Sequence, residues 1–411
     1  MITRPIDQLA VLHVLDVGHG DSIVLELPTR EVIVVDAALS TKARKQTPKT
    51  ILCLEEIARR TGRYDIDLLC LTHPDRDHYG GMSQVIDWAR SHGGNIRRLV
   101  LFPGPAFNEL RERVRRKKEV LLQDNGPLEK YTALRFRQAS REFGKLTDRF
   151  IRLKRSIVSK GMQYNRASDF CHICTIGSAD IYGLGPTSST LDDHADQVWD
   201  SMMGAWLEDK DSLHRSDNQI SRMLLVVIGQ AKIMLTGDAT ASAWLEALRV
   251  YDEHYRSCAC PDILSCIVKA PHHGSQYGSS IEAWKRSLAT DASIVAISCG
   301  LKEHPDKQTI ADIGAASQNA SVFCTNSCQA RRTALGELSG IPVGAVGAWQ
   351  TDSDPPAEIA DFLDPLTCHG DIRFTIDPNG VVTADPQFQH GACNLLASGQ
   401  GDNCYEDHCS V

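Results

Sequence analysis

Four side chains able to bind a metal ion lie within one short segment, namely His73, Asp75, Asp77 and His78. The segment directly follows the apolar run at 68–71. Imidazole nitrogens and carboxylate oxygens are common ligands of divalent metal ions in proteins. A helix cap would account for one of the carboxylates, but not for two imidazoles and two carboxylates together. The spacing therefore predicts a metal site in a turn at the end of a buried strand.

Histidines and aspartates also end four other apolar runs, and these residues are Asp36, Asp238, His272 with His273, and His304. Strands of one sheet can end at the same edge, so residues far apart in the sequence can converge there. The repeated pattern predicts two divalent ions with a bridging water, because a metal pair lowers the pKa of bound water and stabilises the attacking and leaving oxygens. Asp238 is suited to bridge the ions, since each of its carboxylate oxygens can bind one.

The elements that must position these residues follow from the hydrophobic pattern. Alternating apolar residues predict strands within 10–37, where Gly18 and Gly20 allow a tight turn that carries Asp21 and Ser22. The order of the elements predicts a sheet covered by helices. Further strands are expected at 66–73, 95–104, 170–186, 218–237, 266–270, 293–300 and 321–326, a hairpin at 371–385 with its turn at Asn379-Gly380, and helices at 50–62, 82–90, 241–255 and 309–319.

Residues 108–168 form a basic stretch with helical pattern inside an acidic protein of net charge -8. The simpler interpretation is a solvated helical insertion. The alternative is an electropositive arm that draws a polyanion such as nucleic acid toward the site, and the same surface also suits a protein partner. The candidate contacts on this arm are Arg115, Arg116, Lys117 and Lys118.

Composition sets outer limits on the kind of protein. The chain has 411 residues, 42% of them hydrophobic, and contains no run of about 20 apolar residues that could span a membrane. We expect one domain at 8–385, with a long loop at 187–217, and a polar Cys/Gly-rich tail at 386–411. The N-terminus lacks a secretion pattern, so a soluble, cytoplasmic protein is expected. A disulfide framework is not expected from its 14 cysteines, and a structural zinc site built from the later ones is the alternative.

Several segments taken together resemble the metallo-β-lactamase-fold hydrolases, and within them the branch typified by the soluble hydrolase domain of the DNA-uptake protein ComEC. The matching segments are DVGHGDSIVLE, VIVVDAA, LTHPDRDHYGGM, DNQISRMLLVVIGQAKIMLTGD, VKAPHHGSQYGS and AISCGLKEHP. They cover most of residues 10–320 apart from the basic insertion. The resemblance implies an α/β (α+β) fold, a four-layer αββα sandwich with the metals at one edge between the two sheets.

The resemblance also implies a set of ligands for two divalent ions, zinc or manganese. The set is His73, Asp75, Asp77, His78, Asp238 and one of His272 and His273. Asp75 replaces the second histidine of the family motif, as is typical of the ComEC-like branch. Asn218 stands where the family usually has a third histidine, and oxygen-rich coordination favours harder ions, which makes manganese as suitable as zinc. His304 matches a late ligand or a proton donor, although Glu303 replaces the glycine of the branch.

The implied activity is metal-dependent hydrolysis of phosphodiester bonds, by a nuclease that acts on DNA or RNA through a metal-bridged hydroxide. One alternative is a small-molecule hydrolase acting on a lactone, thioester or cyclic nucleotide, and another is a regulatory module with a vestigial site. The residues expected to take part in catalysis are Asp77, His304 and Asp21, and those expected to contact substrate are Ser22, Asn218 and Ser275, besides the four basic residues of the insertion.

Overall fold

The computed structural model describes part of the chain. The described residues are 9–39, 47–73, 75–101, 164–165, 171–194, 196–197, 217–255, 261–289, 293–298, 304–325 and 371–384. Nearly all of the basic insertion, including Arg115, Arg116, Lys117 and Lys118, lies outside these residues, and so does the tail at 386–411.

The first of two sheets has eight strands in the order β15-β14-β1-β2-β3-β4-β5-β6. The three N-terminal strands pair antiparallel, whereas β3 to β6 run parallel. The strands are β1 (Ala10–Val14), β2 (Ser22–Glu26), β3 (Val32–Ala37), β4 (Leu68–Leu71), β5 (Leu99–Leu101), β6 (Tyr164–Asn165), β14 (Ile372–Ile376) and β15 (Val382–Ala384).

The second sheet has seven strands in the order β13-β12-β11-β10-β9-β8-β7. Strands β10 to β13 run parallel and the others antiparallel. The strands are β7 (Cys171–Ile176), β8 (Ala179–Gly185), β9 (Met223–Ile228), β10 (Ala231–Leu235), β11 (Ile267–Lys269), β12 (Ile294–Ile297) and β13 (Ser321–Cys324).

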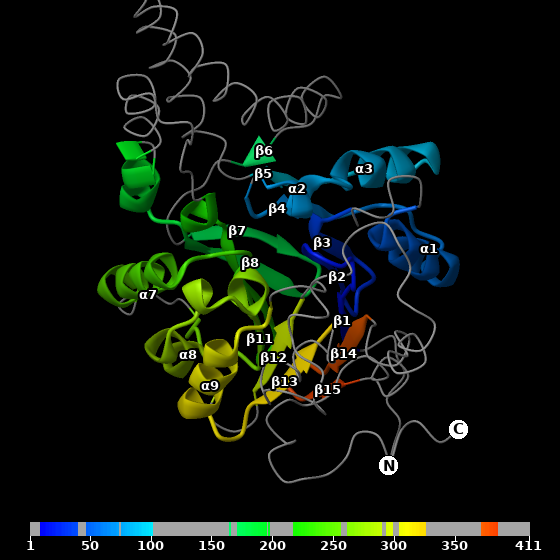
Figure 1. Cartoon of the computed structure of the whole chain (residues 1–411). Coiled ribbons are helices and arrows are strands. Elements are labelled where there is room, and N and C mark those ends of the chain that lie inside the picture. Colours follow the sequence, from blue (N-terminus) through cyan, green and yellow to red (C-terminus); the bar gives the residue numbers. More distant parts are fainter. Residues whose placement is uncertain are drawn as a thin grey trace, which may run out of the picture.

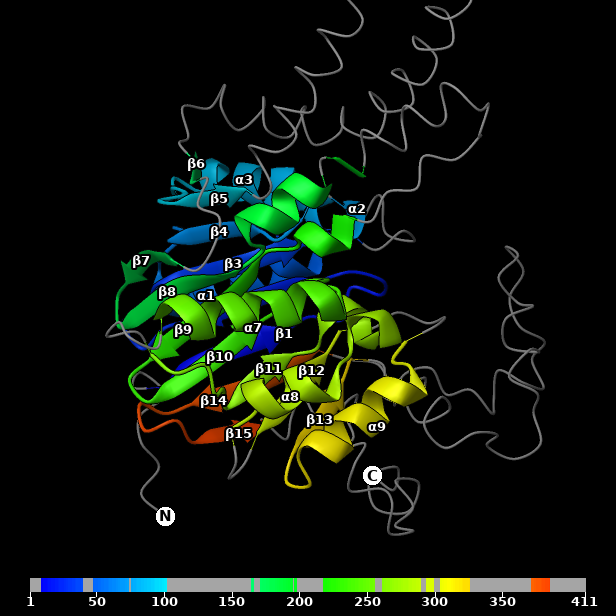
Figure 2. The same cartoon turned by 90° about the vertical axis from the view of Figure 1, so that its left-hand side faces the viewer.

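Helices cover the outer face of each sheet, as Figures 1 and 2 show. Separate apolar cores lie under each helical layer and a third lies between the sheets. The four layers confirm the expected αββα architecture. The helices over the first sheet are α1 (Lys49–Thr61), α2 (Arg76–Tyr79) and α3 (Met82–Ser91), those over the second are α7 (Ala241–Tyr255), α8 (Ile281–Ser287) and α9 (Lys307–Ala316), and the short 3-10 turns are η3 (Asp217–Ile220), η4 (Pro271–Gly274) and η5 (Gln276–Gly278).

Strand β4 illustrates why an uninterrupted apolar run forms a strand here. Leu69 and Leu71 pack in the core beneath the helices, whereas Leu68 and Cys70 pack in the core between the sheets. Because both faces of a parallel strand are covered, each side chain must be apolar. The first polar side chains can only come where the strand leaves the sheet, and this places the metal-ligand candidates at its end.

The predicted elements are largely confirmed, but two short helices, at 188–194 and α8, were not expected from the sequence. The hairpin turn has Gly380 at φ +86°, and α1 ends at Gly62 with φ +71°, as glycine allows. Residues 188–194 are helical, although a loop was expected. The hydroxyl of Thr187 accepts a hydrogen bond from the Thr190 N–H at 3.2 Å, a capping contact that starts this short helix. No helix among the described residues is long and apolar enough to cross a membrane.

Candidate metal centre

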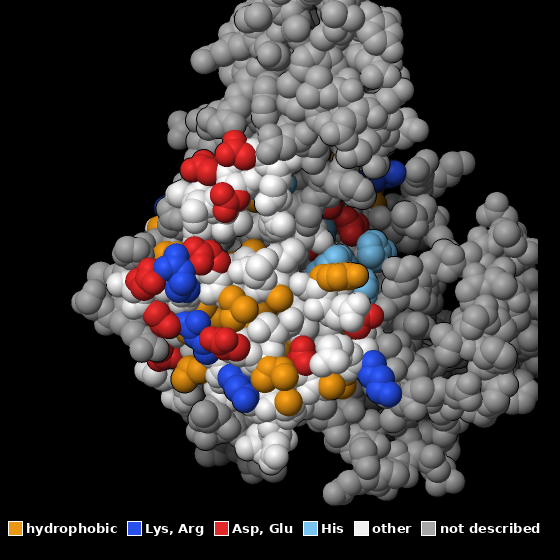
Figure 3. All heavy atoms as spheres, turned by 60° about the vertical axis from the view of Figure 1, so that its left-hand side comes forward, with side chains coloured by type: hydrophobic (Ala, Val, Ile, Leu, Met, Phe, Trp, Pro, Cys, Tyr) orange, Lys and Arg blue, Asp and Glu red, His pale blue; other side chains and the backbone are white. Residues whose placement is uncertain are grey.

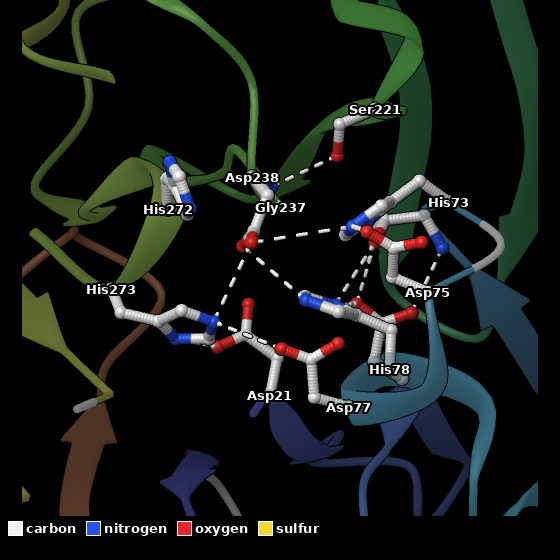
Figure 4. A network of polar contacts seen from close by, with 12 residues as sticks. Asp21, His73, Asp75, Asp77, His78, Ser221, Gly237, Asp238, His272 and His273 are labelled. Carbon is white, nitrogen blue, oxygen red and sulfur yellow. Dashed lines mark hydrogen bonds and ion pairs between the residues drawn. The ribbon is translucent and has the colours of Figure 1, made fainter. Parts of the chain in front are cut away.

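The chain brings the predicted ligand residues to one edge of the sandwich, between the two sheets (Figure 4). His73 follows β4, and Asp77 and His78 lie on the short helix α2. Asp238 follows β10, and His273 follows β11 on η4. Each sheet therefore supplies part of the cluster, and only the folded sandwich can assemble it.

Four of these residues form a tight group. One ligand atom from each of Asp77, His78, Asp238 and His273 lies within 4.8 Å of the others. Nε2 of His78 is 3.4 Å from Oδ1 of Asp238, and Nε2 of His273 is 3.4 Å from Oδ2 of the same carboxylate. Nε2 of His273 also lies 3.6 Å from Oδ2 of Asp77. The two oxygens of Asp238 therefore each face an imidazole of this group.

The ligand atoms are buried and face one another without forming regular hydrogen bonds. Among the described residues, Nε2 of His73, His78 and His273 and Oδ1 of Asp238 are buried with no hydrogen-bond partner. A buried polar atom without a partner costs about 1–3 kcal/mol. A divalent cation that accepts these lone pairs would remove that cost, so the donor set fits a metal ion.

Neighbouring groups fix the ring orientation of two of the histidines. Nδ1 of His78 donates to Oδ2 of Asp36 at 2.7 Å, and Nδ1 of His273 donates to the carbonyl oxygen of Ser298 at 3.0 Å. The Asp36 carboxylate is itself held by the N–H and the hydroxyl of Thr72, at 2.8 and 2.6 Å. With Nδ1 occupied, the lone pair of each ring lies on Nε2 and points into the cluster, which is the usual arrangement behind a metal-binding histidine.

The charges of the cluster reinforce one another. Burial alone would raise the pKa of Asp238, but the imidazoles of His273 and His78 hold it well below its ordinary value. Burial alone would lower the pKa of His78, but the carboxylates of Asp238 and Asp36 raise it well above its ordinary value. The pKa of His273 is raised in the same way, against the effect of burial, by Asp238 and Asp77. Without a cation, the group is therefore held together by imidazolium–carboxylate pairs.

Comparison with known proteins agrees with this architecture. Residues 15–120 match the family model described as the metallo-beta-lactamase superfamily. The chain has the metallo-β-lactamase fold. No curated protein sequence matches the chain.

Solved structures similar to this metallo-β-lactamase fold include three proteins of low sequence identity. The metallo-β-lactamase fold protein YhfI from Bacillus subtilis is 7% identical, with 77% of this chain and 95% of that chain covered and a TM-score of 0.37. The long form of RNase Z from yeast is 11% identical, with 77% and 41% covered and a TM-score of 0.36. A diphosphatase of the PhnP family is 11% identical, with 75% and 93% covered and a TM-score of 0.34.

A looser pair lies beside the tight group. Nε2 of His73 is 3.6 Å from Oδ2 of Asp75 and 4.0 Å from Oδ2 of Asp238. The Asp75 side chain is 47% exposed. These two residues with Asp238 could hold a second ion nearer to solvent. The side-chain nitrogen of Asn218 lies 3.2 Å from Nε2 of His272.

The structure distinguishes the two neighbouring histidines that the sequence left open. Their backbones lie in the left-handed region, with φ +46° at His272 and +55° at His273, which is rare for residues other than glycine. This backbone turns His273 inward, where it is fully buried in the tight group. His272 is half-buried and points away from that group (Figure 4), with its ring centroid 5.7 Å from that of His304. Burial lowers the pKa of His272.

Three residues expected to act on substrate have structural partners instead. Asp21 is fully buried, pairs with the ammonium of Lys269 and accepts a hydrogen bond from the Ser298 hydroxyl. The hydroxyls of Ser22 and Thr50 are 2.5 Å apart, which ties Ser22 to α1. The buried Ser275 caps η5 by accepting the N–H of Tyr277 at 3.3 Å. These contacts favour positioning roles for Asp21, Ser22 and Ser275 over contact with substrate.

The rim of the centre contains a histidine that the sequence did not single out as a site residue. His19 is 62% exposed, and its Nε2 lies 3.2 Å from Oδ2 of Asp77. Its ring centroid is 4.8 Å from that of His273. Figure 3 shows histidine and acidic side chains gathered on one face of the molecule. The only sequence signal for His19 is its place between Gly18 and Gly20, in the turn that also carries Asp21.

Proposed function

We propose that this protein is a metal-dependent hydrolase of phosphodiester bonds, and that it acts as a nuclease. The observation that carries the proposal is the convergence of four buried, unpartnered ligand atoms, from His73, His78, His273 and Asp238, at one edge of the sandwich. Proteins of the superfamily whose model matches residues 15–120 typically bind divalent metal ions, usually zinc.

The proposed roles follow from the positions of the side chains. Bound ions, zinc or manganese, would activate water and neutralise charge on the phosphate. The tight group would hold one ion, and His73 and Asp75 with Asp238 the other. His304 would hold a proton for the leaving oxygen, because it lies at the rim beside His272, with Nδ1 3.7 Å from Oδ2 of Asp306. Asp36 and Ser298 would keep the ligand rings in place.

Tyr277 supports nucleic acid as the substrate class. Its side chain is 71% exposed and belongs to η5, which begins three residues after His273. The turn is fixed by a hydrogen bond of 2.7 Å from the Gln276 N–H to Oδ2 of Asp306. Exposed aromatic rings beside a phosphate site offer a surface on which bases stack. The ComEC-like sequence segments and the basic insertion support the same substrate class.

The test is a cleavage assay on linear DNA, circular DNA and RNA, with manganese, zinc or magnesium. Asp77→Ala should lower the metal-dependent rate by about 1,000-fold or more, because it removes a charged ligand of the ions. Asp87→Ala, at an exposed position of α3, is the matched control and should leave the rate unchanged. Equal rates for the wild type and Asp77→Ala, or no cleavage with any metal, would refute the proposal.

The same preparations should be offered a lactone, a thioester and a cyclic nucleotide. If one of these is hydrolysed in a manner that depends on Asp77 while polynucleotides are not, the protein is a small-molecule metallohydrolase. If Asp77→Ala leaves binding of every divalent ion unchanged, the site is vestigial and a regulatory role replaces catalysis.

A further inference from the structure

A buried lysine ammonium lies directly beside the candidate metal centre. Lys269, the last residue of β11, is 1% exposed. Its Nζ pairs with Oδ2 of Asp21, donates to the carbonyl oxygen of Gly237 at 3.0 Å and lies 3.9 Å from Oδ1 of Asp238. One carbonyl and two carboxylates are the surroundings that a metal cation would take, and here the cation belongs to the chain.

The pair of Lys269 and Asp21 joins the two halves of the sandwich. Asp21 directly precedes β2 of the first sheet, and Lys269 belongs to β11 of the second. Both side chains are almost completely inaccessible to water. Lysine and aspartate are almost never buried unless they are paired, because an isolated buried charge is very costly. The two residues therefore depend on each other, and a change to one leaves the other as an uncompensated charge.

Because Asp21 is itself a potential metal ligand, its pairing with Lys269 affects metal binding. Asp21, Asp36 and His78 form a second group whose ligand atoms lie within 4.8 Å of one another. Asp36 already accepts the N–H of His78, and Lys269 pairs with Asp21. Both carboxylates are thereby engaged within the chain, and the ions are left to the tight group and to the looser pair nearer the solvent.

We propose that Lys269 is an internal counter-ion of the metal centre, which keeps Asp21 out of the ligand set and lowers the affinity of the centre for divalent cations. The inference rests on the metal centre proposed above. The positive charge of Lys269 repels a divalent ion bound by Asp238, and the repulsion is strong because both side chains are buried. The lysine thus balances Asp21, so that the pair adds little net charge to the site.

The test is a charge cycle on the full-length protein, with manganese affinity measured by isothermal titration calorimetry. Lys269→Met leaves Asp21 as an extra anion and should tighten manganese binding by about 10-fold or more. Asp21→Asn leaves the lysine charge unopposed and should weaken binding by about 10-fold or more. The double variant removes both charges and should return to within about threefold of the wild type.

The order of the four affinities decides the question. Binding by Lys269→Met that is equal to or weaker than that of the wild type would overturn the counter-ion role, and Lys269 would then serve only to join the sheets. If circular dichroism shows that Lys269→Met does not fold, the comparison of Asp21→Asn with the double variant decides, since equal affinities for those two would also overturn it. If the wild type binds no divalent ion, both this inference and the metal centre are wrong.

Discussion

At the scale of single residues, the centre depends on which ring nitrogen of each histidine points inward. Nδ1 of His78 and of His273 is occupied by Asp36 and by the Ser298 carbonyl, so that both Nε2 atoms face Asp238. These partners lie 42 and 25 residues away from the histidines that they hold. The sequence pattern placed Asp36 at the end of a strand, but it did not predict that Asp36 pairs with His78.

Asp36→Asn should therefore weaken metal binding although Asp36 is not a ligand. The amide cannot hold the His78 ring as the carboxylate does, and removal of such an orienting carboxylate typically costs 10–100-fold in metal affinity. Asp67→Asn is the matched control, because Asp67 is also buried but lies at the opposite end of β4, where it accepts the Val32 N–H at 2.9 Å. Titration of both variants with manganese tests the role. An equal decrease in affinity for the two variants would contradict it.

Protonation of the centre predicts opposite pH trends for the metal-free and metal-loaded protein. Because the pKa of His78 in the folded state is raised well above 6.5, its stabilising charge is fully present below the unfolded pKa. That contribution is lost as pH rises through the folded pKa. Divalent cations compete with the same proton, so they bind more tightly as pH rises.

Calorimetric unfolding between about pH 6 and about pH 9, with chelator or with manganese, checks this prediction. As pH rises over this range, the stabilisation of the metal-free protein by charged His78 should be lost, which lowers its Tm. The increase in Tm caused by manganese should become larger. A manganese-induced increase in Tm that is independent of pH would show that no proton is displaced from the centre.

At the scale of elements, the site depends on how closely the turn before β2 approaches α2. The N–H of Asp21 donates to the backbone oxygen of Asp77 at 3.0 Å. Gly20 lies in this turn at φ +136°, and a methyl group there would collide with that same oxygen and come 2.7 Å from Cβ of Ala38. Gly18, at φ +78°, has nothing within 4 Å of such a methyl group.

Gly20→Ala should accordingly destabilise the protein and weaken metal binding, whereas Gly18→Ala should cost only about 1–2 kcal/mol of backbone strain and leave metal affinity unchanged. Chemical denaturation and manganese titration of the two variants provide the comparison. Variants that behave alike in both measurements would mean that the close approach of the turn to Asp77 is not needed for the centre.

The elements predicted from the sequence are those with strong apolar patterns, such as β4 and β9. The helix at 188–194 and α8 were missed because each is only about seven residues long and has too few turns for a periodic pattern. Helix α8 is held by the buried ring of Trp284, which packs edge-to-face on Trp244 of α7 with the ring centroids 4.8 Å apart. Tertiary packing and a capping side chain, Thr187 or Ser280, stabilise such short helices, and a periodic sequence pattern does not report them.

At the scale of the whole molecule, the two sheets each contribute half of a site that neither could form alone. The repeated pattern of polar residues after apolar runs made this convergence predictable, because parallel strands end at a common edge. It did not decide between His272 and His273, since that choice depends on two residues with positive φ. It also did not reveal Lys269, whose charge is paired only after the sheets meet.

The net charge of -8 makes the origin of any affinity for nucleic acid a question about the whole chain. If the basic insertion guides substrate, reversing the charges of Arg115, Arg116, Lys117 and Lys118 should weaken DNA binding. The slope of the logarithm of the binding constant against the logarithm of salt concentration should also become shallower, by about 0.9 for each phosphate that the protein no longer neutralises. Fluorescence anisotropy with labelled DNA at several salt concentrations measures both quantities. Values equal to those of the wild type would assign the insertion to scaffold or to a protein partner.

The central claim is that buried ligands from both sheets form a divalent metal centre, with His273 inside it and His272 outside. The most direct measurement is manganese affinity by titration calorimetry for wild type, His273→Ala and His272→Ala. Removal of the inward ligand should weaken binding by about 100-fold or more, whereas the variant of its neighbour should stay within about threefold of wild type. Equal effects of the two substitutions, or a greater effect at His272, would contradict the account.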